Sequence, residues 1–294
     1  MKRLLLLAFG VFLFGCEKKV DFKLHDQPDK LVIEGIIEND QAPIVVLTKS
    51  VGYFSTISPA ILNQSFVHGA DVIISNGTLN HKLKEYTRSI GNGVSYSYYS
   101  IDSSNLSTSF VGQLNHQYSL KIVSEGKEYT AITTIPKLTK RIDSVWWKKP
   151  SVVTDSDTSK VIILVRATDP PGYGDYVRYY TKTNREPFYP PLASTFDDYF
   201  IDGTTYELQI DKGVDRNLQS SLDEKYFKRG DTVSFKLSNI DKATYDFWRT
   251  MEYSYSSVGN PFSSPIKVLS NINGDALGYF GGYASQYRTI IIPH

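Results

Sequence analysis

The segment YSLKIVSEGKEYTAITT, residues 118–134, decides the fold class of this chain. Two runs rich in β-branched and aromatic residues, Tyr118–Val123 and Tyr129–Thr134, flank the pair Glu125-Gly126. Apolar and polar residues that alternate with a period of two are typical of a half-buried strand, and a short link containing glycine is typical of a hairpin. The segment therefore predicts two antiparallel strands joined by a tight turn.

Similar signals upstream predict a β-sandwich over residues 31–136. Asn76-Gly77 joins two strand-like runs, and this dipeptide is the strongest short hairpin signal because both residues accept a positive φ. The runs with strand character are Leu31–Ile37, Ile44–Thr48, Ala70–Ser75, Thr78–Tyr86 and Val94–Ile101. With the hairpin above, about seven strands fit one immunoglobulin-like or fibronectin-like sandwich.

Two details refine this expected sandwich. Tyr118 opens a late strand just after a loop, which resembles the tyrosine corner of such sandwiches, where the hydroxyl bonds to upstream backbone. The alternative is a core tyrosine without that bond. Val51–Val67 lacks alternation and contains Pro59, so a long surface loop is expected there.

A second unit is expected over residues 142–294. Pro136–Arg141, with a proline, three basic residues and no apolar period, marks the boundary. The second unit reads as β-rich with at least one helix, over about residues 239–256, and Ser238 with Asp241 resembles its capping box. One face of that helix carries Ile240, Ala243, Phe247, Trp248, Met251 and Tyr255. The expected fold class is therefore mainly β.

The composition of the chain excludes several classes of protein and several kinds of site. The chain has 294 residues, and 32 Lys and Arg residues stand against 31 Asp and Glu residues. Hydrophobic residues make up 41% of the chain and charged residues 21%, and this ordinary globular composition excludes bulk disorder. The charge balance gives no electrostatic reason to expect a nucleic-acid partner. The single cysteine excludes an intrachain disulfide and a zinc site built from cysteines.

Residues 1–15, MKRLLLLAFGVFLFG, predict a secretory signal peptide. Lys2 and Arg3 precede an apolar run that is too short to span a bilayer, which needs about 20 residues. The ending Leu13-Phe14-Gly15-Cys16 resembles a bacterial lipobox, in which the cysteine is lipidated and becomes the new N-terminus. The alternative is cleavage elsewhere, with a free thiol at Cys16.

Residues 16–30 are expected to form the lipidated cysteine and a polar tether. Several acyl chains anchor a protein stably because each buried CH₂ contributes about 0.8 kcal/mol. Glu17 rather than Asp follows Cys16, and under the common lipoprotein sorting rule this favours the outer membrane. The tether is mixed in charge, so the cell surface and the periplasmic face both stay open.

The sequence carries none of the common catalytic signatures. A Gly-x-Ser-x-Gly elbow, a His-Glu-x-x-His motif, a phosphate loop and a Gly-x-Gly-x-x-Gly loop are all missing. No catalytic residue and no cofactor is therefore expected. A hydrolase stays open as an alternative, because the separation of paired carboxylates is spatial and not visible in sequence.

Metal ligands are not expected either. The five histidines lack ligand spacing, and His81, between polar neighbours in an expected strand, is interpreted as a solvated side chain. Asp155–Ser159, and Asp197-Asp198 with Asp202-Gly203, could offer oxygen ligands to Ca²⁺. A polar hairpin tip and a turn are the simpler interpretations of these two segments.

Aromatic clusters are the candidate binding residues. Exposed tyrosines can stack on sugars or anchor a protein partner at a low entropy cost. The candidates singled out are Tyr96, Tyr98, Tyr279, Phe280 and Tyr283. The alternative is that these rings, like those around Tyr176 and Tyr255, cover sheet faces and form cross-strand pairs.

The C-terminal stretch Ser270–Tyr283, SNINGDALGYFGGY, is the most distinctive part of the chain. Together with the lipobox, Leu31–Gly35, Ala70–Val72 and the passage from Tyr129 to Val145, it resembles the lipoprotein family catalogued as domain of unknown function 4249. The shared C-terminal pattern is matched by Asn271, Gly274, Gly278 and Phe280, and we expect it to be structural.

The resemblance implies an outer-membrane lipoprotein typical of Bacteroidota. Many members of the family are encoded beside TonB-dependent receptors, which implies a non-enzymatic accessory subunit of a nutrient-import barrel. A surface glycan-binding or adhesion module is the alternative, motivated by the tyrosine clusters. The expected partners are the outer membrane, through the lipid, and a TonB-dependent barrel, without nucleic acid.

Overall fold

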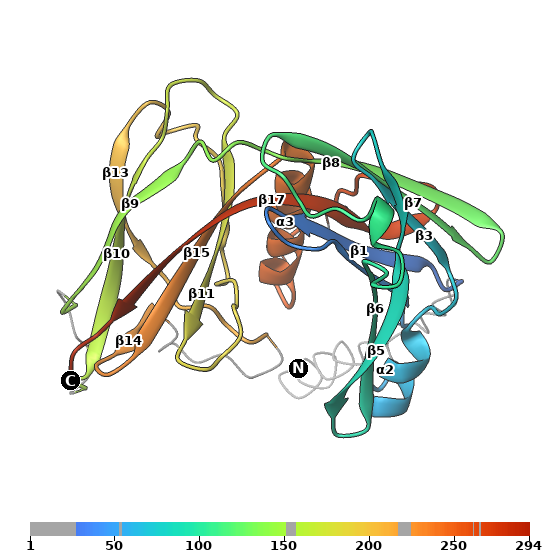
Figure 1. The fold of residues 1–294 in the computed structure, drawn as a ribbon. Coiled ribbons are helices and arrows are strands. Elements are labelled where there is room, and N and C mark those ends of the chain that lie inside the picture. The colour runs from blue at the N-terminus through green and yellow to red at the C-terminus, as the bar shows by residue number, and fades with distance from the viewer. Residues whose placement is uncertain (1–27, 53–54, 151–156, 217–224, 261, 265) are drawn as a thin grey trace, which may run out of the picture.

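A computed structural model describes residues 28–294 except 53–54, 151–156, 217–224, 261 and 265. The expected signal peptide, Cys16, most of the tether and Asp155 lie outside the described residues. The described chain is mainly β, as the sequence predicts, and it contains two α-helices (Figure 1).

The strands form three sheets. Their bounds are β1 Leu31–Glu38, β2 Ile44–Lys49, β3 Asp71–Ser75, β4 Asn80–Lys82, β5 Lys84–Gly91, β6 Val94–Ser100, β7 His116–Ser124, β8 Lys127–Ile135, β9 Arg141–Lys148, β10 Lys160–Thr168, β11 Tyr176–Thr183, β12 Thr195–Phe196, β13 Thr205–Ile210, β14 Phe227–Lys228, β15 Thr232–Ile240, β16 Ile272–Asn273 and β17 Ala276–Ile291. The helices are α2 Pro59–Ser65, α3 Lys242–Ser257 and a 3₁₀ turn at Leu106–Thr108.

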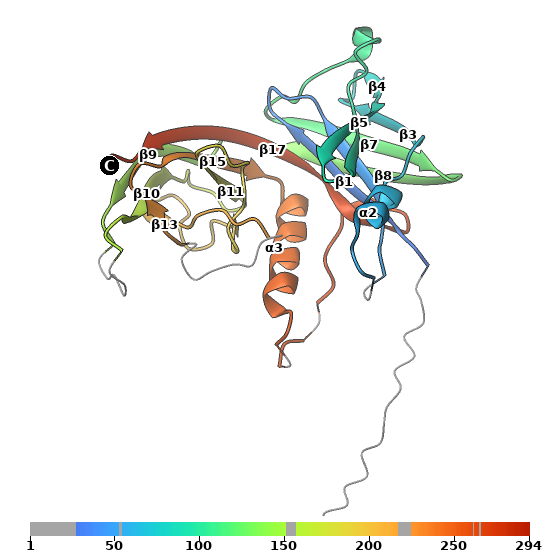
Figure 2. The ribbon, with the colours of Figure 1, turned by 90° about the horizontal axis from the view of Figure 1, so that it is seen from below.

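One long strand, β17, belongs to both halves of the molecule. An eight-stranded sheet has the order β12-β11-β15-β17-β1-β2-β6-β5. The first half of β17 pairs in parallel with β1, from Ala276 to Tyr283, and the second half pairs antiparallel with β15, from Tyr283 to Ile291. In Figures 1 and 2 this strand, coloured red, runs from one β-layered unit into the other.

The first sandwich is closed by residues from the far end of the chain. Its second sheet has the order β16-β8-β7-β3-β4, and its core joins Ile33, Leu47 and Ile122 to Phe280 of β17. β16 and the first half of β17 complete the two sheets. The expected span of 31–136 therefore leaves out two strand segments, because partners so distant in sequence leave no local signal.

The second sandwich faces β9, β10, β13 and β14 against β11, β12, β15 and the second half of β17. Its core is formed by β-branched and aromatic residues that alternate along these strands, among them Val161, Ile163, Val165, Phe227 and Phe235. β10 is apolar on both faces over most of its length, since it is covered on each side.

Helix α3 lies between the two sandwiches (Figure 2) and confirms the helix predicted over about 239–256. Its N-cap is Asp241 rather than Ser238, and the Asp241 carboxylate accepts a 2.8 Å hydrogen bond from Thr244 N. The second oxygen of Asp241 accepts hydrogen bonds from Thr133 Oγ1 at 2.8 Å and Thr134 N at 2.9 Å. One carboxylate thus caps the helix and ties it to β8.

Two glycines set the closest approach between the first and last strands. Ile33 lies opposite Gly278 and Gly35 lies opposite Phe280. A Cβ on Gly35 would lie 2.7 Å from Phe280 Cδ2, so Gly35 makes room for that buried ring. Gly278 has φ +100°, and a Cβ there would lie 1.9 Å from the Ile33 carbonyl oxygen. Each position therefore requires glycine for a separate reason.

The other residues of the C-terminal pattern brace this junction. The Asn271 side-chain amide donates to the carbonyls of Ile132 at 3.0 Å and Phe280 at 2.7 Å, and its oxygen accepts from Phe280 N at 3.0 Å. Gly274 has φ +111°, and a Cβ there would lie 2.8 Å from the Tyr129 ring. Asn271, Gly274, Gly278 and Phe280 thus all have a structural explanation.

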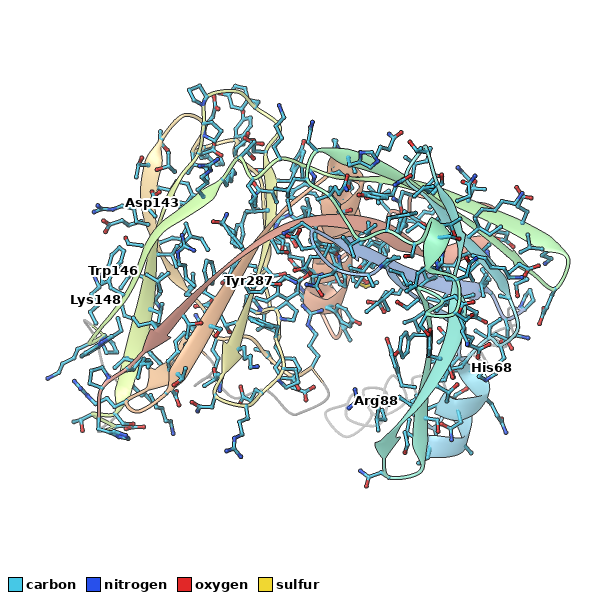
Figure 3. The ribbon with its side chains drawn as sticks, in the orientation of Figure 1. His68, Arg88, Asp143, Trp146, Lys148 and Tyr287 are labelled. Atoms are coloured by element: carbon cyan, nitrogen blue, oxygen red, sulfur yellow. The ribbon has the colours of Figure 1, made fainter. Side chains whose placement is uncertain are left out.

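Side-chain bonds also join β1 to the second half of β17. Glu38 at the end of β1 pairs with Lys236 of β15 at 2.5 Å and accepts a hydrogen bond from the Tyr287 hydroxyl. Tyr287, which lies in the second half of β17, is labelled in Figure 3. Burial, together with this bond to Glu38, raises the pKa of the Tyr287 phenol, which therefore stays protonated and keeps donating.

The expected tyrosine corner is present. Gln113 N donates a 2.7 Å hydrogen bond to the hydroxyl of buried Tyr118, five residues downstream. The expected surface loop over 51–67 is only partly a loop, because Ser58 caps α2 there by accepting from Ile61 N. Among the described residues, no helix has the length and apolar character required to cross a bilayer.

The interpretation of His81 as a solvated side chain is wrong, because the ring is fully buried. Asp102 N donates to His81 Nε2 at 3.0 Å, while Nδ1 lies 2.9 Å from Thr108 Oγ1. Nε2 must therefore be unprotonated, and Nδ1 carries the proton of a neutral ring. Burial lowers the pKa of His81, and the nearby Asp102 carboxylate opposes this shift.

We predict that Gly278→Ala lowers the free energy of unfolding by about 3 kcal/mol or more, since it adds a clash to backbone strain. Gly77→Ala is the matched control, because Gly77 has φ +85° but open space around its Cβ position. It should cost only about 1 kcal/mol. Urea unfolding followed by circular dichroism measures both, and equal losses would refute the close-approach explanation.

We also predict that acid destabilises the fold through His81. The folded-state pKa of His81 is lowered, so below the ordinary histidine value of about 6.5 the unfolded chain binds a proton that the folded chain excludes. The stability contributed by neutral His81 is therefore present above that pH and is lost as the pH falls from 7 to 5. His81→Gln should flatten this slope, and unchanged slopes in chemical unfolding would contradict the assignment.

Candidate functional site

Three of the aromatic residues proposed from the sequence are not accessible. Tyr279, Phe280 and Tyr283 are at most 2% exposed, so the expectation that they bind a ligand at the surface does not hold. β17 is covered on both faces, since Phe280 packs in the first core while Tyr279 and Tyr283 pack under α3. The Tyr279 ring stacks on Phe247 with centroids 4.3 Å apart.

Tyr279 and Tyr283, together with Tyr180 and Trp248, surround a buried cation instead of a ligand. Arg178 of β11 is 2% exposed, and its Cζ lies 3.3 Å from the Trp248 ring centroid and 4.9 Å from that of Tyr180. Its Nε donates to Ser194 Oγ at 3.0 Å, and Ser194 in turn bonds to Glu252. Stacking on aromatic faces stabilises a desolvated guanidinium, which explains the concentration of tyrosines here.

The other two candidates, Tyr96 and Tyr98, are partly accessible. They stack on one face of β6 with centroids 5.8 Å apart, and Tyr98 stacks on Tyr86 of β5 at 5.7 Å. Tyr96 is 36% exposed, and burial of the remainder raises its pKa to about 12. The three rings therefore form a cross-strand ladder, as the alternative interpretation expects. One edge of this ladder, at Tyr96, is accessible to solvent.

The most exposed aromatic cluster among the described residues lies on two loops of the second sandwich. Tyr173 lies in the loop between β10 and β11, and Tyr199 and Phe200 lie in the loop between β12 and β13. The Tyr173 and Tyr199 rings lie 6.5 Å apart, and Tyr199 meets Phe200 edge-on at 4.9 Å. Their exposed fractions are 75%, 69% and 91%. We call these three residues the loop aromatic cluster.

Beside this cluster lies a cavity of about 580 Å³ within the second sandwich. Its floor is apolar and comes from the facing strands β10, β11 and β15, and Phe200 and Leu208 stand at its wall. The lining residues are Val165, Ala167, Val177, Tyr179, Ala193, Thr195, Phe196, Asp197, Phe200, Ile201, Tyr206, Glu207, Leu208, Gln209, Asp211, Phe235, Leu237, Tyr245 and Arg249. A mainly apolar cavity with a few polar groups is the usual form of a small-molecule site.

Polar groups of the cavity include side chains from α3. The Tyr245 hydroxyl donates a 2.9 Å hydrogen bond to Asp197, and burial together with this bond raises the pKa of Tyr245 to about 12. Glu207 pairs with Arg166 of the neighbouring strand. Arg249 is exposed, and within the described part of the chain its guanidinium makes no hydrogen bond or ion pair. It is the group best placed to meet an anionic end of a bound molecule.

Carboxylates at the base of the two loops come together. Asp198 of the β12–β13 loop accepts hydrogen bonds from Gly174 N at 2.8 Å and Asp175 N at 2.9 Å, both in the β10–β11 loop. Asp202, also proposed from the sequence as an oxygen ligand, bonds instead to Gly172 N at 2.6 Å. Asp169 completes the group around Asp198. Asp169 opens the segment Asp169-Pro170-Pro171-Gly172, which is a turn signal without metal-ligand spacing.

The comparisons with known proteins add a family but no function. No curated protein matches the chain. The sequence model of a family described as "Domain of unknown function (DUF4249)" matches residues 17–289, which covers both sandwiches and the C-terminal pattern. The chain therefore belongs to the DUF4249 family.

Proposed function

We propose that the protein is a non-enzymatic, lipid-anchored outer-membrane protein that serves as an accessory subunit of a TonB-dependent nutrient transporter. The signal peptide and lipobox before Cys16 support the anchor. Fourteen residues lie between Cys16 and Leu31, and an extended chain of that length reaches at most about 50 Å. A neighbouring membrane protein is therefore within reach of the folded part.

The loop aromatic cluster is the observation that carries this proposal. Three large rings, each more than two-thirds exposed, stand together on two neighbouring loops. Contiguous exposed apolar groups on a folded protein mark interaction sites, and tyrosine is enriched among the residues that dominate binding energy. The cluster provides an aromatic anchor for the partner barrel.

The cavity supports a more specific form of this accessory role, in which the protein holds the transported molecule. Phe200 belongs to both the loop aromatic cluster and the cavity wall. A partner docked on the cluster therefore lies against the mouth of the cavity. We propose that the cavity holds a small, mainly apolar nutrient and that docking places it beside the import barrel.

The docking prediction is tested by co-purification. With a tag after His294, one TonB-dependent barrel should co-elute at near equal amounts from gently solubilised outer membranes. The double substitution Tyr199→Ser, Phe200→Ser should reduce co-elution at least about tenfold, because each exposed aromatic anchor contributes about 2 kcal/mol. Tyr253→Ser, Tyr255→Ser, on an exposed part of α3, is the matched control and should leave it unchanged.

A protein that stays membrane-anchored but elutes alone would contradict the transporter role. That result would favour the alternative of a surface glycan-binding module. The stacked ladder of Tyr86, Tyr98 and Tyr96 supports this second candidate, because planar rings at 5.7–5.8 Å spacing offer a flat face to sugar rings.

The cavity prediction uses an apolar fluorescent probe, N-phenyl-1-naphthylamine. We expect saturable binding to the purified chain, and Leu208→Asp should weaken it about tenfold by placing a charge in the apolar wall. Leu192→Asp is the control, since Leu192 is 63% exposed and does not line the cavity. Equal affinities for both variants would show that the probe binds elsewhere.

A further inference from the structure

A buried charge cluster lies where the linker after β8 meets the loops of the candidate surface. Asp169 follows β10, Asp175 precedes β11, Asp198 follows β12, and Lys140 ends the linker. Asp169, Asp198 and Lys140 are 1%, 3% and 0% exposed. One carboxylate oxygen from each of the three aspartates lies within 4.8 Å of the other two.

Several polar atoms of this cluster lack the partners that burial demands. Both carboxylate oxygens of Asp169 and the Lys140 ammonium nitrogen make no hydrogen bond within the described residues. Lys140 Nζ lies 3.5 Å from Asp169 Oδ1, whereas a charge-assisted hydrogen bond spans about 2.7–2.9 Å. Buried polar atoms are almost always hydrogen-bonded, and an exception points to an ion or a water at the site.

The charges do not balance. Three carboxylates contribute −3 and Lys140 contributes +1, so a net charge of −2 is confined largely out of contact with solvent. Burial raises the pKa of Asp169, Lys140 opposes this, and Asp175 and Asp198 raise it further. An isolated buried charge is costly unless it is paired or coordinates a metal.

We propose that Asp169, Asp175 and Asp198 bind a divalent cation, Ca²⁺ in preference to Mg²⁺. All the donors are oxygens, which suit hard cations, and the cluster offers neither the nitrogen nor the sulfur ligands that zinc prefers. Ca²⁺ accepts irregular shells of carboxylates, while Mg²⁺ demands near-octahedral geometry and keeps its waters. One divalent ion and three carboxylates together carry a net charge of −1, and the Lys140 ammonium neutralises this charge.

The cation would connect the two loops that carry the candidate surface. The β10–β11 loop contributes Asp169 and Asp175 and holds Tyr173, and the β12–β13 loop contributes Asp198 and holds Tyr199 and Phe200. Binding would therefore order the loop aromatic cluster and the cavity wall together. This inference goes beyond the accessory role and stands without it, because it rests on the carboxylates alone.

Calorimetry and thermal unfolding of the full chain in detergent, stripped with EDTA, test the proposal. Titration with CaCl₂ should show one saturable site, with MgCl₂ binding at least about tenfold more weakly. Saturating Ca²⁺ should raise the unfolding temperature by about 5 °C. Tb³⁺ in place of Ca²⁺ should luminesce on tyrosine excitation, because Tyr173 and Tyr176 line a hollow with Asp198.

Three variants distinguish two explanations of the cluster. Either the aspartates bind a cation, or Lys140 alone balances their charge. Asp175→Asn, at the half-buried member, should weaken Ca²⁺ binding at least about tenfold. Asp197→Asn, beside Asp198 but outside the cluster, should not. Lys140→Met removes a repelling charge and should preserve or tighten Ca²⁺ binding. Circular dichroism checks that each variant folds.

Two results would overturn the proposal. One is a wild-type chain that binds no Ca²⁺ at about 10 mM, above the roughly 1 mM range of the weakest extracellular sites, with an unfolding temperature insensitive to EDTA. The other is binding that Asp175→Asn and Asp197→Asn leave equally strong. Neither result bears on the docking experiment, because co-purification with a barrel can succeed without the cation.

Discussion

The parallel pairing of β1 with the first half of β17 is the contact on which the rest of the structure depends. It brings residues 31–38 beside residues 276–283, and it is possible only because Gly278 lets the backbones approach and Gly35 leaves room for Phe280. The remainder of β17 then continues into the second sandwich. One strand therefore contributes to two cores, and α3 packs against its Tyr279 and Tyr283.

Local patterns predict local structure here, as the hairpin at Glu125-Gly126 shows. That turn has positive φ at both residues and joins β7 to β8, and it follows from the alternation of the flanking runs together with the glycine in the link. Helix α3 and the tyrosine corner at Tyr118 follow equally from short-range signals. The closure of the first sandwich by β16 and β17 could not be predicted, because the partner strands are more than 130 residues away and pairing at that distance leaves no period in the sequence.

Burial was the property that sequence reasoning judged least well. The sequence predicts Tyr279 and Tyr283 as binding residues, but they pack around α3, whereas Tyr199 and Phe200, in a loop without any binding signal, are exposed. His81 and Lys140 are polar residues with polar neighbours, yet both are fully buried. In each case the side chain's environment is set by a strand or loop from elsewhere in the chain. Asp169, Asp175 and Asp198 meet for the same reason.

We propose that the β10–β11 and β12–β13 loops of the second sandwich form the face that meets a membrane partner. Site-specific photo-crosslinking in living cells tests it directly, with a benzophenone amino acid introduced at Tyr199 and, for comparison, at Tyr96 of the first sandwich. We predict one dominant adduct from position 199, containing a TonB-dependent barrel. An equal or stronger adduct from position 96, or none from position 199 in an anchored protein, would contradict it.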